Sequence, residues 1–264
     1  MCGIAGIISK KSIDINTGQL QKLMSNRGPD SFETSSGSFG KINFAFYFSR
    51  LSIIDLDRRS NQPFKKFDNV IVFNGEIYNY LELKKELEKK YKFNTSSDTE
   101  VLLTAYEEYG ENLCDYLEGM WSFVIFDSRK ETFFISNDPF GEKPLYYYQN
   151  SDTFIFSSEL NYFKILNPTN YLPNIEKVKS FLYEGYRVTK QDDSTFIQNI
   201  YSFPSSQLWK INKNLAVNKL TYWKLEYKPE FEMSYEEAKN KTQDLIENSI
   251  KIRSRADVNV GISL

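Results

Sequence analysis

Histidine is absent from this chain of 264 residues, and cysteine occurs only twice. The absence of histidine excludes Ser-His-Asp and Cys-His catalytic machinery, and it excludes metal sites that use imidazole ligands. Two cysteines cannot build a disulfide framework, and they make a poor metal site. Any acid–base chemistry in this protein therefore needs a proton acceptor other than imidazole.

The chain also lacks long apolar runs and a strong net charge. No run approaches the roughly 20 residues of a membrane span. The opening GIAGII is too short for a secretory signal and lacks a basic flank. A formal net charge of −2 gives no electrostatic reason to expect nucleic acid or an anionic membrane as a partner. We therefore expect a reduced, cytoplasmic protein with neither of these partners and with no metal site.

Aromatic residues are abundant, with 21 Phe and 18 Tyr, so the chain can build a sizeable core. Aromatic and β-branched runs predict strands, and amphipathic spacing predicts helices. Strands are predicted at 2–9, 41–55, 69–75, 143–148, 153–159 and 205–212, with a hairpin over 119–138. Helices are predicted at 17–27, 79–93, 96–110 and 234–253, and the stretch 212–233 is predicted to be a connector. Strands that come in blocks favour an antiparallel α+β fold over a doubly wound sheet.

Cys2 stands directly before the apolar run GIAGIIS. If Met1 is removed, Cys2 carries the free α-amino group, whose reference pKa of about 7.7–8.0 suits a proton acceptor near neutral pH. Threonine activated by its own N-terminal amine is the same arrangement. A lone cysteine is more often a small buried hydrophobe, and that reading is kept for Cys114.

Several motifs together carry a family resemblance: MCGIAGI, RGPD, FSRLSIIDL, FNGEIYNY, SSDTEVLL and NDPFGEKPLYY. In this order and spacing the chain resembles the class II, N-terminal nucleophile (Ntn) glutamine amidotransferases, and within them the glutamine-hydrolysing asparagine synthetases. The resemblance implies an Ntn-hydrolase fold, a four-layer αββα sandwich of antiparallel sheets. It also implies hydrolysis of glutamine to glutamate and ammonia, with glutamine as the substrate and no cofactor for that step.

The resemblance assigns roles to eight residues. It implies that Cys2 is the nucleophile and that Asn74 and Gly75 form the oxyanion hole. The glutamine-binding residues that it implies are Arg50, Leu51, Ile53, Asn74, Gly75, Glu76 and Asp98. A guanidinium suits the glutamine α-carboxylate, so Arg50 is assigned to it, and Asp98, with help from Glu76, is assigned to the α-ammonium.

Each of these assignments has a plainer alternative. Asn74-Gly75 could be a simple turn, although the following residues read as a helix and not as the second strand of a hairpin. Arg50 could form a structural salt bridge, and Asp98 could be a helix N-cap. Arg27 and Asp30 border the site without an assigned role. Asn137 and Phe48 depart from the family pattern, which puts local packing in doubt but not the chemistry.

The end of the chain, DVNVGISL, resembles the lead-in to an SGG pyrophosphate-binding loop. We expect residues 1–205 to be the glutaminase domain. Residues 206–264 would be a connector and the truncated start of an ATP-dependent α/β synthetase domain. ATP and Mg²⁺ are expected only with the missing part of that domain. A separate synthetase chain or a second copy of this chain is the partner that the sequence leaves open.

Three functions remain after this reading. In the first, the domain supplies ammonia for asparagine synthesis from aspartate. In the second, the ammonia amidates another carboxylate, such as an acidic sugar of a surface polysaccharide. In the third, the chain is a non-catalytic glutamine-binding or regulatory remnant. The presence of every motif that the chemistry needs favours the first two.

Overall fold

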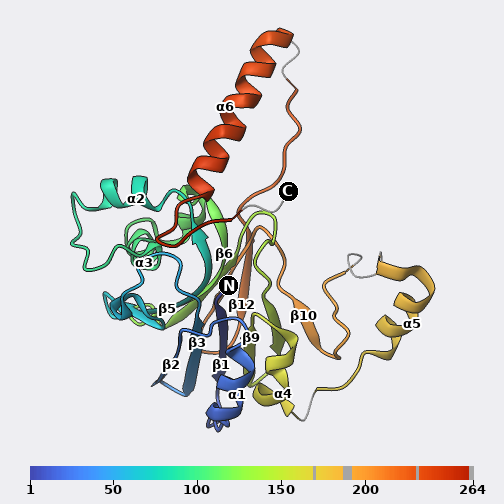
Figure 1. Cartoon of the computed structure of the whole chain (residues 1–264). Coiled ribbons are helices and arrows are strands. Elements are labelled where there is room, and N and C mark those ends of the chain that lie inside the picture. The colour runs from blue at the N-terminus through green and yellow to red at the C-terminus, as the bar shows by residue number, and fades with distance from the viewer. Residues whose placement is uncertain (169–170, 187–191, 230–231, 262–264) are drawn as a thin grey trace.

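The computed structural model describes residues 1–168, 171–186, 192–229 and 232–261. Two six-stranded sheets stack against each other, and every strand pair in them is antiparallel (Figure 1). The predicted antiparallel α+β class is therefore confirmed.

The first sheet carries the N-terminus on a central strand. Its order is β10-β8-β9-β1-β3-β2. The strands are β1 (Gly3–Ser9), β2 (Ser31–Phe39), β3 (Ile42–Arg50), β8 (Tyr146–Gln149), β9 (Thr153–Ser157) and β10 (Ile200–Ser202). Strand β1 pairs with β3 on one side and β9 on the other, starting at Gly3 opposite Ser49. The residue before β1 is Cys2, so the sheet fixes the position of this cysteine.

The second sheet has the order β12-β11-β7-β6-β5-β4. Its strands are β4 (Phe64–Lys66), β5 (Asn69–Ile77), β6 (Gly119–Asp127), β7 (Thr132–Asn137), β11 (Gln207–Ile211) and β12 (Val217–Thr221). The predicted hairpin over 119–138 is β6 and β7. The stretch 212–233, predicted to be a connector, contains β12, which pairs with β11 along its whole length. The second sheet thus continues past residue 205, where the sequence placed the domain boundary.

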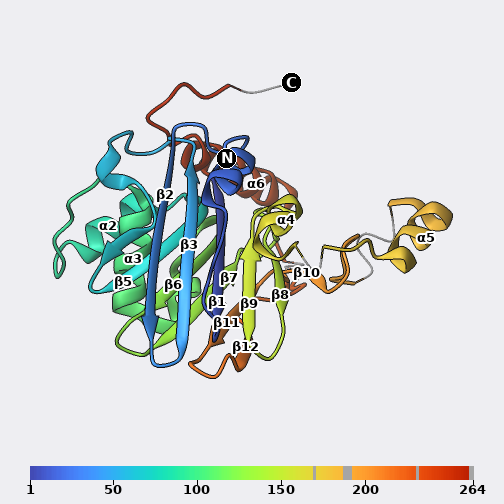
Figure 2. The same ribbon diagram turned by 90° about the horizontal axis from the view of Figure 1, so that it is seen from below.

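Helices cover the outer faces of both sheets. The helices that do so are α1 (Thr17–Met24), α2 (Tyr80–Leu87), α3 (Asp98–Tyr109) and α4 (Phe163–Leu166), while α5 (Ile175–Glu184) and α6 (Tyr235–Arg253) stand apart. Residues of α2 and α3 share one core with the outer side of β5 and β6, and residues of α1 and α4 share another with β1 and β3. Figure 2 shows these layers from the side of the first sheet. The arrangement is the predicted four-layer αββα sandwich.

Aromatic rings fill the space between the two sheets. Phe44 and Phe46 of the first sheet meet Phe126 and Phe133 of the second with ring centroids 4.5–6.1 Å apart. Phe156 belongs to the same layer, and it fits because residue 6 is glycine: a Cβ there would lie 2.4 Å from the Phe156 ring. Such large rings bury much apolar area each, so this layer supplies much of the stability that holds the strand ends in place.

Two helices extend away from the sandwich. Helix α5, which the sequence analysis did not predict, stands to one side (Figure 2). Helix α6, which was predicted, stands out from the sandwich near α2 and α3 (Figure 1) and begins with a capping box formed by Ser234 and Glu237. Among the helices in the described ranges, none combines the length and the apolar character that a membrane crossing requires.

Candidate active site

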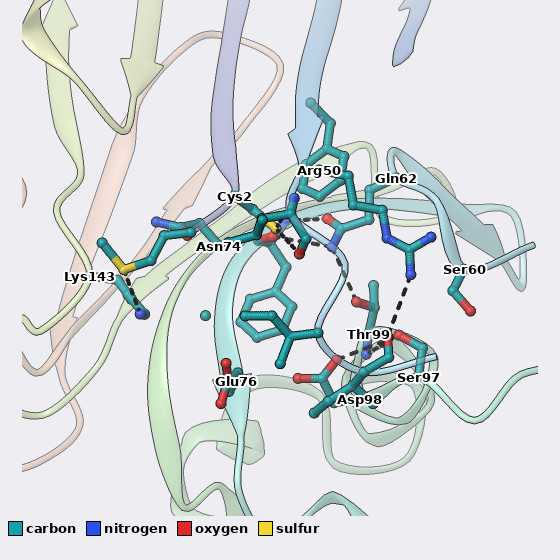
Figure 3. A pocket seen from close by; sticks show the side chains of 17 residues that line it. Cys2, Arg50, Ser60, Gln62, Asn74, Glu76, Ser97, Asp98, Thr99 and Lys143 are labelled. Atoms are coloured by element: carbon teal, nitrogen blue, oxygen red, sulfur yellow. Dashed lines mark hydrogen bonds between the residues drawn. The ribbon is translucent and has the colours of Figure 1, made fainter. Parts of the chain in front are cut away.

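One pocket collects all eight residues that the sequence singled out. Its lining includes Cys2, Arg50, Leu51, Ile53, Asn74, Gly75, Glu76 and Asp98. They come from the start of β1, the end of β3 with the loop after it, the second half of β5 and the start of α3. Figure 3 shows the side chains of Cys2, Arg50, Asn74, Glu76 and Asp98 around one space.

Cys2 is half-buried and held from two directions. Its Sγ accepts the Leu51 N–H at 3.4 Å, and its S–H points to the Leu51 carbonyl at 3.5 Å. Its own carbonyl accepts the Arg27 Nε–H at 2.9 Å, and Arg27 is in turn paired with Glu159 at 3.2 Å. Burial raises the pKa of the Cys2 thiol, against the effect of the Leu51 hydrogen bond. The resting thiol is therefore protonated, and its reactivity depends on a nearby base.

The N-terminal amine, which in this structure belongs to Met1, has a lowered pKa. Burial is the main cause, and the positive charges of Arg27 and Lys143 act in the same direction. Lys143 is 4% exposed, and its Nζ donates to the Met1 Sδ at 3.1 Å (Figure 3). Among the described residues, the Met1 thioether is therefore the hydrogen-bond partner of this buried ammonium group.

Asn74 and Gly75 lie inside β5, opposite Ser122 and Trp121 of β6, and do not form a turn. The Asn74 side chain is 1% exposed, and its Nδ2 has no hydrogen-bond partner in the part of the chain that the structure describes. Leaving a buried donor unpaired costs free energy, so such a group is functional or is paired by a ligand. At Gly75 a Cβ would lie 2.1 Å from the Met120 carbonyl oxygen. Only glycine fits beside the unpaired amide.

Asp98 and Glu76 place two carboxylates on one side of the pocket. Ser97, not Asp98, is the N-cap of α3, since its side chain accepts the Thr99 N–H at 3.1 Å. The Asp98 carboxylate accepts the Ile77 N–H at 3.1 Å. Burial raises the pKa of Asp98 to about 7, and the negative charge of Glu76 adds to the shift. A cationic ligand beside this carboxylate would favour its charged form, against the effect of burial.

Arg50 is buried at the other side of the pocket, and it forms no ion pair among the described residues. Its Nη1 donates to the Asp57 carbonyl at 2.8 Å and to Asn61 Oδ1 at 2.6 Å. Its Nη2 donates to the carbonyls of Ile54 and Asp55. The guanidinium therefore shapes the loop that follows β3, which the sequence reading did not anticipate. These contacts use the Nη1 and Nη2 donors of Arg50, and its Nε–H takes part in none of them.

The sequence analysis missed several residues of the pocket. Gln62 ties the loop after β3 to the second sheet: its Oε1 accepts the Phe73 N–H at 2.6 Å, and its Nε2 donates to Thr99 Oγ1 at 3.1 Å. Lys143 arrives from the segment between β7 and β8. Its motif, NDPFGEKPLYY, was recognised as part of the family resemblance, but nothing in the local pattern indicates that the lysine faces Cys2.

The two departures from the family pattern are accommodated by packing. The Asn137 side chain donates to the Phe203 carbonyl at 3.4 Å and accepts the Asp138 N–H at 3.0 Å. Phe48 is 1% exposed and belongs to the core between the sheets. Cys114 is a buried core residue, and burial raises the pKa of its thiol to about 12, which agrees with the structural role predicted for it.

Comparisons with known proteins agree with this geometry. The family model described as "Glutamine amidotransferase domain" matches residues 1–223. A putative glutamine-hydrolysing asparagine synthetase 2 of Methanocaldococcus jannaschii is 34% identical over 100% of this chain and 54% of its own length. Glutamine-hydrolysing asparagine synthetase 1 of Bacillus subtilis is 35% identical over 99% of this chain and 41% of its own. The chain thus spans about half the length of the curated relatives that it matches.

A solved structure gives the same fold. The glutamine phosphoribosylpyrophosphate amidotransferase of Bacillus subtilis aligns with a TM-score of 0.59 at 17% sequence identity, covering 84% of this chain and 49% of that one. This likeness confirms the Ntn-hydrolase architecture, and the sequence matches extend over the residues of the pocket. The chain belongs to the glutamine amidotransferase domain family and is homologous to the glutamine-hydrolysing domain of asparagine synthetases.

Proposed function

We propose that this chain hydrolyses glutamine to glutamate and ammonia at Cys2. The observation that carries the proposal is the unpaired Nδ2 of Asn74, which faces the same pocket as the Cys2 thiol. Acyl transfer needs a nucleophile beside a preorganised donor for the developing oxyanion, and this pocket holds both.

The reaction follows from the positions of these groups once Met1 is removed. The Cys2 α-amine takes the thiol proton, and Sγ attacks the side-chain amide carbon of glutamine. Asn74 Nδ2, together with the Gly75 N–H, stabilises the oxyanion. When the C–N bond of the side-chain amide breaks, the protonated α-amine of Cys2 gives its proton to the departing nitrogen, which leaves as ammonia. Water then attacks the γ-glutamyl thioester, the amine accepts the proton of that water, and the released thiol is re-protonated.

The α-groups of glutamine fit the two charged sides of the pocket. The carboxylates of Asp98 and Glu76 suit the α-ammonium, and ion pairing with it would restore the charge that burial disfavours on Asp98. Arg50 supplies positive charge and its Nε–H for the α-carboxylate. Leu51 and Ile53 line the pocket between these ends. A substrate with both α-groups free, as in glutamine itself, satisfies both sides.

We propose that the released ammonia is used for asparagine synthesis. The support is homology to asparagine synthetases over the full length of this chain. Aspartate, ATP and Mg²⁺ would be bound by a synthetase domain, of which residues 234–264 would contribute the beginning, or by a separate synthetase chain. Hydrolysis at Cys2 itself needs no cofactor, and we propose that it takes place in the cytoplasm.

The test is the intact mass of the protein before and after treatment with the glutamine analogue 6-diazo-5-oxo-norleucine. We expect a chain lacking Met1 to gain one adduct, mapped to Cys2, and excess glutamine to prevent it. Cys114 serves as the internal control because its buried thiol should not react. A chain that retains Met1, or an adduct that glutamine does not compete away, would leave a non-catalytic binding module as the better description.

A further inference from the structure

A short segment outside the matched family domain reaches back to the pocket. The family model ends at residue 223; the chain after it leads away from the sandwich, and helix α6 leads back to it, ending beside α2 and α3 (Figure 1). After α6 the chain returns along the side of α2 and α3 before it reaches the C-terminus (Figure 1). We call residues 253–257 the strap. Ile252, just before it, is the buried residue of α6.

The strap holds the loop that follows β3, residues 51–57, which we call the rim loop. The Asp257 N–H donates to the Ile53 carbonyl at 2.9 Å, and the Asp257 carboxylate accepts the Asp55 N–H at 2.7 Å. Asp55 has a φ of +50°, which is unusual for a residue other than glycine. Two hydrogen bonds from one strap residue thus bracket Ile54, within the loop that supplies Leu51 and Ile53 to the pocket.

The strap also contacts the segment that follows Glu76 of the pocket lining. The Arg255 guanidinium pairs with both carboxylate oxygens of Glu82 at 2.6 Å and donates to the Tyr78 carbonyl at 2.5 Å. The Arg253 guanidinium lies 4.7 Å from the centre of the Tyr78 ring. Tyr78 follows β5 two residues after Glu76, so the contacts fix the chain that leaves the α-ammonium side of the pocket.

Rim-loop geometry depends on contacts from both of its faces. From inside, Arg50 donates to the carbonyls of Ile54 and Asp55. From outside, Asp257 binds the N–H of Asp55 and the carbonyl of Ile53. If the outer contacts are lost, the rim loop keeps its hydrogen bonds from Arg50 but becomes more mobile. Glutamine binding must then order the loop again, which lowers the affinity. The Leu51 peptide, which holds the Cys2 sulfur, lies at the start of the same loop.

We propose that the strap is a positioning element for the glutamine site, with Asp257 and Arg255 setting glutamine affinity by fixing the rim loop and the segment that follows Glu76. This inference rests on the proposed glutaminase function. Neither residue touches the reacting atoms.

The test compares Asp257→Ala, Asp257→Asn and Arg255→Ala in the full chain, with Asp244→Ala on the exposed face of α6 as the matched control. Loss of one or two such hydrogen bonds should raise the KM for glutamine by about 5–10-fold and leave kcat within about twofold. Asp257→Asn keeps an oxygen acceptor for the Asp55 N–H and should restore most of the affinity. Hydrogen exchange should quicken at residues 53–55 in Asp257→Ala but not in the control.

The outcomes separate this inference from the proposed function. Wild-type protein that hydrolyses glutamine, together with an Asp257→Ala variant of unchanged KM and unchanged exchange, overturns the strap and leaves the glutaminase function intact. Equal losses in Asp257→Ala and the control would show a general effect on folding and would also overturn it. A mature wild-type chain that neither binds nor hydrolyses glutamine overturns both proposals.

Discussion

Replacing Asp98 by asparagine should make the empty protein more stable at alkaline pH while it destroys glutamine binding. Asp98 is 6% exposed, and its pKa rises from 3.8 to about 7 on folding. Because the folded protein binds this proton more tightly than the unfolded chain, the associated stability is fully present below pH 3.8. It is lost as the pH rises to about 7.

The magnitude follows from these two pKa values. Between pH 5 and pH 8 the wild type should lose about 2.5 kcal/mol of unfolding free energy through Asp98, a loss that the asparagine variant does not share. Urea unfolding without glutamine, at both pH values and for both proteins, measures this difference directly. Comparing the two pH values cancels the fixed cost of introducing the amide.

A matched control is Asp127→Asn. The pKa of Asp127 is lowered by hydrogen bonds from Lys130 and Tyr106 that outweigh its burial. Its contribution is present above pH 3.8 and is lost only as the pH falls further, so this variant should differ from wild type by the same amount at pH 5 and pH 8. Parallel pH dependence of wild type and Asp98→Asn would refute the reasoning.

Four further results are expected. The KM for glutamine should rise about 10-fold from pH 8 to pH 6 as Asp98 becomes protonated, and an unchanged KM would argue against its pairing with the α-ammonium. Asn74→Ala should lower kcat by about 10²–10³ with little change in KM, measured as ammonia release. Gly75→Ala should reduce the yield of folded protein, because its Cβ would lie 2.1 Å from the Met120 carbonyl oxygen. Lys143→Met should move the acid limb of the kcat/KM profile to higher pH, since the positive charge of Lys143 lowers the pKa of the N-terminal amine and would be lost.

The sequence predicted the parts of the site that sit on regular strands. Cys2 precedes an apolar run that had to enter a sheet, and Asn74-Gly75 follows VIVF without the second strand that a hairpin requires. Ser97 and Asp98 were placed correctly at a helix start, but which of them caps the helix is decided by the fold. The Asp98 carboxylate meets the N–H of Ile77, 21 residues away, and this contact leaves the cap to Ser97.

Three other features could not be predicted from local sequence patterns: strand β12, the role of Arg50 and the contacts of the strap. Strand β12 was read as connector because most of its residues are exposed, so it lacks the apolar alternation that marks a half-buried strand. Arg50 was expected to hold the substrate, yet most of its donors bind the loop after β3, a backbone arrangement that spacing does not reveal. The strap contacts the chain just after β5 across 177 residues of sequence, from Arg255 to Tyr78, and no periodicity encodes such a contact.

The contact between Lys143 and Met1 gives the newly made chain the character of a precursor. With Met1 in place, its thioether accepts a hydrogen bond from the Lys143 ammonium. The free amine then belongs to Met1 and not to Cys2, whose thiol needs the proton acceptor. Under the proposed function, a methionine aminopeptidase is then the activating enzyme, and it removes a one-residue propeptide. Overproduction that outpaces this processing would yield folded but silent protein. The specific activity of a preparation would then report the fraction of its chains that have matured.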